Sequence, residues 1–170
     1  MDVYFGDSDW YKLERQGGLL YVTLRVLYAG GPADGTEVKF ILDTGAYLTV
    51  ISRGTAVRRG YDKLPKRTTT LFGFSGGVMA DYVRIPGMII KKRTRTDVPV
   101  LIPHDMYRTD PVTNEKKQLQ DVLGLNVLEY YNYYVDSEND RLYLRDNPNP
   151  KLYDELLESG QVFTANTGTP

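Results

Sequence analysis

Short stretches in which apolar and polar residues alternate recur along this chain, separated by clusters of turn residues. In the stretch 19–28, Leu20, Val22 and Leu24 alternate with more polar neighbours. A period of two places the apolar side chains on one face of a β-strand. Related patterns predict further strands over 37–42, 68–72, 78–85, 88–90, 98–102, 133–136 and 141–144. Because βαβ alternation and internal repeats are both absent from the sequence, we predict a mostly β fold.

Apolar residues at helical spacing occur in two short segments. The first is 123–131, which follows a Leu-Gly pair, and the second is 152–158, near the C-terminus. Each predicts one short helix, because apolar residues three or four positions apart share a helix face.

The domain organisation follows from composition along the chain. Residues 1–18 are predicted to form an N-terminal arm, and 19–146 a single domain. Within it, the polar segment 103–120 is predicted to be a surface insertion. Residues 147–170 are predicted to form a linker, the short helix and a frayed tail.

The composition excludes several classes of function. The chain has 170 residues, the size of one domain with its own core. Its 21 Lys and Arg residues nearly balance 22 Asp and Glu residues, so neither a nucleic acid nor an anionic membrane is favoured as a partner. The absence of cysteine excludes a disulfide framework, a thiolate nucleophile and a Cys-ligated zinc site. A single histidine, His104, is a poor basis for a metal site, so we expect no metal and no cofactor.

The sequence also bears on location. No apolar run reaches the length that spans a membrane, and the acidic first ten residues lack the basic and apolar regions of a secretory signal. We therefore expect a cytoplasmic protein.

One acidic residue stands where an apolar strand meets a turn. Asp43 follows Phe40-Ile41-Leu42 and begins the sequence Asp43-Thr44-Gly45-Ala46. A carboxyl group at the mouth of a core is partly desolvated, which raises its pKa and suits it to proton transfer. The simpler interpretation is that Asp43 only begins a turn, since such a tripeptide also occurs by chance.

Two further features follow in a fixed order. The segment Gly73-Phe74-Ser75-Gly76-Gly77 joins two predicted strands and indicates a hairpin with a glycine tip. Later, Val122-Leu123-Gly124 leads into the first predicted helix. With these three features in this order, the chain resembles the retropepsin-like aspartic proteases, the single-domain relatives of the retroviral enzymes, over about 19–144.

This resemblance implies a fold and a set of roles. The implied fold is a closed β barrel with a glycine-tipped flap hairpin and a short helix after the Leu-Gly motif. Asp43 matches the catalytic aspartate, and Thr44 the buried hydroxyl that braces two active-site loops against each other. Gly45 and Ala46 match the rest of the catalytic loop. The flap tip that covers the substrate matches Phe74, Ser75, Gly76 and Gly77, and the strand and glycine behind the loop match Val122, Leu123 and Gly124.

The chain departs from the retroviral pattern at one pair of positions. Retroviral members have an acid two residues after the loop glycine and an arginine just after the later glycine. Here these positions hold Tyr47 and Leu125. Because both halves of the ion pair are missing together, we expect apolar packing at this junction.

Aspartic proteolysis needs two carboxylates that share one proton. The chain supplies one Asp-Thr-Gly, and the other candidate, Asp136-Ser137-Glu138, lacks the glycine. The resemblance therefore implies a homodimer with Asp43 of each subunit on the two-fold axis and an extended polypeptide as substrate. Ala46 cannot donate a hydrogen bond to the dyad as Ser or Thr would, so we expect activity at weakly acidic or neutral pH.

Two other functions are compatible with parts of the sequence. The segment 73–77 also fits Gly-x-Ser-x-Gly, the nucleophile elbow of serine hydrolases, with His104 and either Asp97 or Asp81 as partners. An elbow needs a helix after Ser75, whereas 78–85 is predicted to be a strand. The second alternative is a retropepsin-like dimerisation or peptide-binding module with little or no proteolysis, which has no evident need for Asp43.

Overall fold

The computed structural model describes residues 10–73 and 76–150, and for 71–73 and 76–77 it describes the backbone alone. The predicted helix over 152–158 and the predicted flap residues Phe74 and Ser75 lie outside the described residues.

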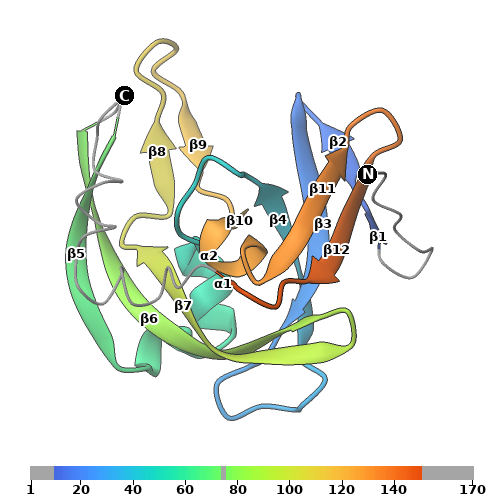
Figure 1. Ribbon diagram of the computed structural model, residues 1–170. Coiled ribbons are helices and arrows are strands. Elements are labelled where there is room, and N and C mark those ends of the chain that lie inside the picture. Colours follow the sequence, from blue (N-terminus) through green and yellow to red (C-terminus); the bar gives the residue numbers. More distant parts are fainter. Residues whose placement is uncertain (1–9, 74–75, 151–170) are drawn as a thin grey trace.

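Seven strands form the main sheet (Figure 1). They are β2 (Glu14–Gln16), β3 (Leu19–Val26), β4 (Thr36–Leu42), β5 (Lys66–Gly73), β6 (Gly76–Ile90), β7 (Arg93–Pro103) and β10 (Val122–Leu123). Five of them lie in the order β10-β4-β3-β6-β5, while β2 pairs with β3 and β7 with β6. The β10 strand runs parallel to β4, whereas the other pairs in this sheet are antiparallel.

Two smaller sheets complete the described β structure. One contains β1 (Trp10–Lys12), β12 (Arg141–Asp146) and β11 (Tyr131–Asp136), in the order β1-β12-β11. The other is a hairpin of β8 (Tyr107–Thr109) and β9 (Lys116–Gln118), which lies within the predicted insertion 103–120. The mostly β class is confirmed. The proposed domain limits stay a proposal, although β1 and β2 of the predicted arm pair with β12 and β3.

Within the described ranges, three short helical segments connect the strands. Helix α1 (Arg53–Arg58) and the 3-10 turn η2 (Tyr61–Lys63) lie between β4 and β5, and α2 (Leu125–Leu128) follows β10. The Ser52 side chain caps α1 by accepting a hydrogen bond from the Thr55 N–H. Helix α2 is shorter than the pattern over 123–131 suggests, because β11 begins at Tyr131.

The core lies where the main sheet meets α2 and β11. Val22 on β3 is paired with Phe40 on β4, and both are buried. They pack in one cluster with Ile85 of β6, Val100 of β7 and Tyr131 of β11. Burial of each such side chain stabilises the fold by about 1.5–3 kcal/mol. This packing fixes the position of the end of β4, and Asp43 is the residue that directly follows it.

The closed barrel expected from the resemblance is not found among the described strands. Strands β10 and β5 stand at opposite ends of the strand order. The reason lies in β6, which pairs with β3 only at Met88 and Ile89 but with β5 from Gly76 to Val83. Strand β6 also stays paired with β7 from Ala80 to Ile90, and β7 and β10 are linked through isolated bridges of Val50 with Leu101 and Val122, so β5 remains at the edge of the sheet (Figure 1).

No helix in the described ranges is long and apolar enough to cross a membrane.

Candidate active site

Asp43 follows the last residue of β4, and its backbone continues the pairing with β10. Its N–H donates to the Leu123 carbonyl at 3.2 Å, and its own carbonyl accepts from the Ala46 N–H at 3.3 Å. The carboxylate Oδ1 accepts a hydrogen bond from the Gly45 N–H at 2.9 Å. The carboxyl group is thus held in a tight turn, yet Asp43 is exposed on the single chain. The partial desolvation that the sequence suggested is not seen without a partner.

The segment behind this loop carries the predicted residues Val122, Leu123 and Gly124. Val122 and Val50 exchange two backbone hydrogen bonds, each of 2.8 Å. A Cβ on Gly124 would lie 2.5 Å from the carbonyl carbon and oxygen of Leu48, closer than real Cβ atoms come. Because the two backbones approach so closely, glycine is the residue that fits at this position.

A buried polar pair, Thr49 and Asn126, connects the loop that follows Asp43 to α2. Asn126 Oδ1 accepts hydrogen bonds from the Thr49 N–H at 2.8 Å and the Thr49 hydroxyl at 2.9 Å. Asn126 Nδ2 donates to the Pro99 carbonyl at 2.7 Å, and the Gly124 N–H donates to Thr49 Oγ1 at 3.0 Å. Thr49 and Asn126 are 0% and 2% exposed. Buried groups that are fully hydrogen-bonded specify a single arrangement of the loop.

Sequence reasoning missed Thr49 and Asn126, and it expected apolar packing where they lie. The backbone adds to the same connection, because the N–H groups of Leu125 and Asn126 donate to the carbonyls of Ala46 and Tyr47 at 2.8 and 3.0 Å. The junction that lacks the retroviral ion pair is therefore joined by hydrogen bonds. Neither residue carries a local sequence signal, because their contact joins segments 77 positions apart.

The other predicted site residues belong either to the catalytic loop or to the flap hairpin. Thr44 is exposed on the single chain, so the bracing role implied for its hydroxyl stays a prediction about a dimer. Gly76 and Gly77 begin β6 and pair with Gly73 and Phe72 in the predicted hairpin. Phe74 and Ser75, the rest of the predicted flap tip, lie outside the described residues.

A buried carboxylate ties the base of this hairpin to α1. Asp81 of β6 is 4% exposed and lies 3.1 Å from Arg53 Nη2. Its Oδ1 lies 2.7 Å from His104 Nε2 and accepts the Thr68 hydroxyl at 3.0 Å, and Lys66 Nζ is 4.0 Å from Oδ2. Burial opposes ionisation, but hydrogen bonds from His104, Arg53 and Thr68 outweigh it and hold the pKa of Asp81 below its usual value.

Replacing Asp81 by asparagine is expected to destabilise the fold by about 3 kcal/mol, because it leaves Arg53 facing a neutral group. A carboxyl whose pKa is lower in the folded state stabilises the fold above its unfolded pKa. That stabilisation is lost as the pH falls below about 4, so the wild type loses more stability there than the variant does. Urea unfolding at several pH values measures both effects. Asp105→Asn, an exposed carboxylate beside His104, is the matched control. Equal stability of Asp81→Asn and the wild type at neutral pH would contradict this role.

The contact of His104 with Asp81 does not support the serine-hydrolase alternative. The residues after Ser75 form strand β6 from Gly76 onward. A nucleophile elbow requires a helix at that point.

Comparison with known proteins places these features in a family. Residues 30–130 match the model of the family described as gag-polyprotein putative aspartyl protease. The fold is similar to the crystal structure of a retropepsin-like aspartic protease from Rickettsia conorii, with a TM-score of 0.55 and 17% identity over 79% of this chain and 87% of that chain. The EIAV protease complexed with the inhibitor HBY-793 gives a TM-score of 0.45 and 17% identity over 68% of this chain and 89% of that chain. None of the curated proteins matches the sequence significantly.

The family match covers more than half of the chain and includes both the loop that carries Asp43 and the Gly124 segment behind it. The resemblance seen in the sequence is thereby confirmed, and the similarity to the Rickettsia structure agrees with it at the level of the fold. The chain belongs to the gag-polyprotein putative aspartyl protease family and has a retropepsin-like, mostly β fold.

Proposed function

We propose that this protein is an aspartic endopeptidase that is active as a homodimer. The observation that carries the proposal is the placement of Asp43: its backbone is held by β10 and its turn by α2, yet its carboxylate is open on the single chain. A carboxylate needed only to begin a turn has no need of such support. Because the chain belongs to an aspartyl protease family, a carboxylate in this position is expected to take part in peptide hydrolysis.

The dimer follows from the chemistry. Hydrolysis by this route needs two carboxyl groups that share one proton. Each chain contributes one such carboxyl group, that of Asp43 after the apolar strand β4. The loop that carries Asp43 is exposed on the single chain, so the same loop of a second copy can approach it. A two-fold axis through this point would bring Asp43 and Thr44 of both copies together.

In this arrangement the ionised Asp43 takes a proton from water as the water oxygen attacks the carbonyl carbon of the peptide bond. The protonated Asp43 of the second copy gives its proton to the carbonyl oxygen, which forms a tetrahedral diol. Return of a proton to the amide nitrogen then allows the C–N bond to break. The substrate would lie extended, with its backbone against the β5–β6 hairpin acting as a flap.

A peptide digest with the molecular mass measured in the same sample tests this function. We expect cleavage of unstructured peptides by a species of twice the chain mass, with activity per chain rising as dilute samples are concentrated. Cleavage by a monomeric species, or no cleavage at concentrations where the dimer is present, would contradict it.

Ala46→Ser is expected to move the pH profile toward acid. The added hydroxyl can donate to the ionised Asp43, which lowers the dyad pKa by roughly one unit. The wild type should work best at weakly acidic to neutral pH, and the acid limb of the variant should shift downward. The profile of kcat/KM measures both. A wild-type optimum below about 3 would contradict this account of Ala46.

A further inference from the structure

One short segment, residues 121–123, holds both ends of the loop that carries Asp43. This loop runs from Asp43, directly after β4, to Ser52, directly before α1. At its start the Asp43 N–H donates to the Leu123 carbonyl at 3.2 Å. At its end the Ser52 N–H donates to Asp121 Oδ1 at 2.7 Å. The candidate catalytic carboxylate therefore lies in a loop whose two ends are fastened to the same three residues.

Asp121 joins the two elements between which this loop runs. Its side-chain Oδ2 accepts the Thr55 hydroxyl of α1 at 2.9 Å, and its backbone carbonyl accepts the Ile41 N–H of β4 at 2.8 Å. Ser52 and Thr55 are buried, and Asp121 is half-buried. A buried hydrogen-bonding group that loses its partner is costly, so these contacts hold Asp121 and its partners in one arrangement.

Helix α1 has its own cap and does not depend on Asp121 to begin. The Ser52 side chain already accepts the Thr55 N–H at 3.4 Å. The Ser52 N–H, which Asp121 accepts, precedes the first residue of the helix and ends the loop. This contact therefore fastens the end of the loop to the segment behind it.

The two oxygens of Asp121 matter more at this position than its charge. Burial raises the pKa of Asp121, although the hydrogen bonds from Ser52 and Thr55 and the positive charge of Arg59 act in the opposite direction. The surroundings therefore disfavour the ionised form. Asparagine keeps an acceptor for the Ser52 N–H, and its amide can donate to the Thr55 hydroxyl.

We propose that Asp121 is a positioning residue of the candidate active site, which fixes the end of the Asp43 loop by accepting the Ser52 N–H, an inference that rests on the proposed function. Asp121 acts through the loop backbone and takes no part in proton transfer. Val122, the next residue, exchanges two hydrogen bonds with Val50, so release of Ser52 also weakens this adjacent pairing and displaces Asp43. A shift of about 1 Å at a reacting group can lower the rate about 100-fold.

Two variants of Asp121 test this role through the kinetics of peptide cleavage. Asp121→Ala is expected to lower kcat by about 10- to 100-fold with KM changed by less than about threefold, because the reacting groups are misaligned while the surfaces that bind the peptide are kept. Asp121→Asn should keep kcat within about threefold of the wild type, since it keeps the acceptor for the Ser52 N–H. Initial rates over a range of peptide concentrations, taken well below each thermal midpoint, measure kcat and KM.

Backbone hydrogen exchange of the full-length protein without peptide gives a second readout, which does not depend on activity. The N–H groups of Asp43 and Val50 both donate to the segment 121–123. In Asp121→Ala they should exchange at least about tenfold faster relative to the amides in the middle of β6, because local opening of the loop exposes them. In Asp121→Asn these ratios should stay close to those of the wild type.

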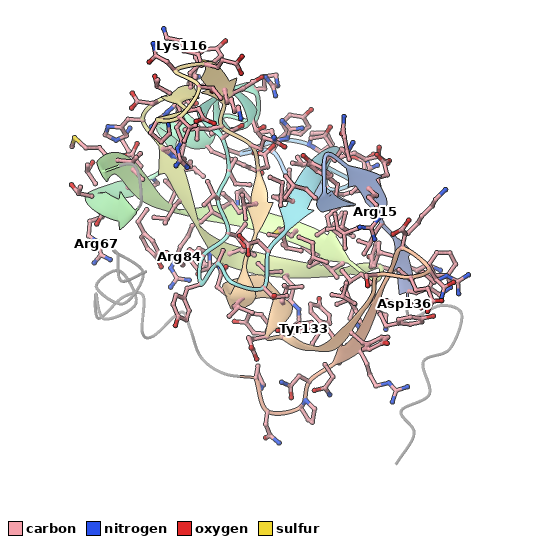
Figure 2. All side chains as sticks on the ribbon, turned by 90° about the horizontal axis from the view of Figure 1, so that it is seen from above. Arg15, Arg67, Arg84, Lys116, Tyr133 and Asp136 are labelled. Atoms are coloured by element: carbon pink, nitrogen blue, oxygen red, sulfur yellow. The ribbon has the colours of Figure 1, made fainter. Side chains whose placement is uncertain are left out.

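Two controls separate positioning from stability. Asp136→Ala is the matched control, because Asp136 is also half-buried and accepts one backbone and one side-chain N–H, both from Asn139. Asp136 ends β11, in a hairpin that Figure 2 shows at the edge of the molecule, so neither kcat nor the exchange of the loop amides should change. Ser52→Ala removes the cap of α1 but keeps the Ser52 N–H. Although this variant also loses stability, its kcat should stay at least about fivefold above that of Asp121→Ala.

A wild-type kcat in Asp121→Ala, or faster exchange confined to the amides of α1, would overturn the positioning role. An asparagine variant as impaired as the alanine variant would overturn it as well. Failure of the proposed function has a different result: the wild type cuts no peptide, while the amides of Asp43 and Val50 still exchange faster in Asp121→Ala than in Asp121→Asn.

Discussion

Asp43→Asn is expected to lower peptide hydrolysis by about 10⁴-fold while leaving the fold and the dimer intact. Asparagine cannot serve as general base or carry the shared proton. It can still accept the hydrogen bond from the Gly45 N–H, which is the side-chain contact described for Asp43, and the position is exposed. Initial rates on an unstructured peptide, together with the thermal midpoint and the molecular mass, measure all three properties.

The matched control for this variant is Asp136→Asn. Asp136 belongs to the other Asp-containing candidate, and the structure places it at the end of β11, where it accepts hydrogen bonds from Asn139. Its strand, β11, pairs with β12 and is not part of the catalytic loop, so activity should be unchanged. If Asp43→Asn hydrolysed the peptide at the wild-type rate, Asp43 would have no role in the reaction.

Asn126→Ala is expected to destabilise the protein by about 4 kcal/mol, a large part of the 5–15 kcal/mol that a typical domain has. The change removes the acceptor of the Thr49 N–H and hydroxyl and the donor to the Pro99 carbonyl, all in a buried region. Each buried polar group left without its partner costs about 1–3 kcal/mol. Urea unfolding measures the loss.

Asn132→Ala is the control for that variant, since Asn132 is an exposed asparagine on β11 and its loss should change stability by less than about 0.5 kcal/mol. Activity of Asn126→Ala should also fall under conditions where the protein is still folded, because Asn126 helps to hold the loop of Asp43. Similar stabilities of the two variants would show that the Thr49–Asn126 pair does not support the loop.

The strands of this fold could be predicted because their signal is local. The alternation around Val22 and the apolar run before Asp43 each reflect one sheet face, so they can be read without knowing the partner strand. Asp43 itself stood out for the same reason, as a carboxyl group at the end of an apolar run followed by Thr-Gly.

The missed features depend on residues far apart in the chain. Thr49 and Asn126 are 77 residues apart, and neither has a local pattern that distinguishes it from an ordinary loop or helix residue. The contacts of Asp81 with Arg53 and His104 join three elements in the same way. Helix α1 was missed because six residues are too few to show helical periodicity.

The closed barrel was the one feature of the fold that the resemblance implied and the described strands lack. Which strand edges meet is set by register: β6 pairs with β3 only near Met88 but with β7 from Ala80 to Ile90. Register depends on tertiary packing, so neither the alternating pattern nor a short motif determines it.

Activity of mixed dimers tests most directly whether each chain supplies half of the site. Wild-type and Asp43→Asn chains are mixed in varying ratios, unfolded and refolded together, and assayed at constant total concentration. If two Asp43 carboxylates act together, activity follows the square of the wild-type fraction, so an equal mixture keeps about a quarter of the full activity. Activity that falls in simple proportion, with about half remaining in the equal mixture, would show that one chain carries a complete site.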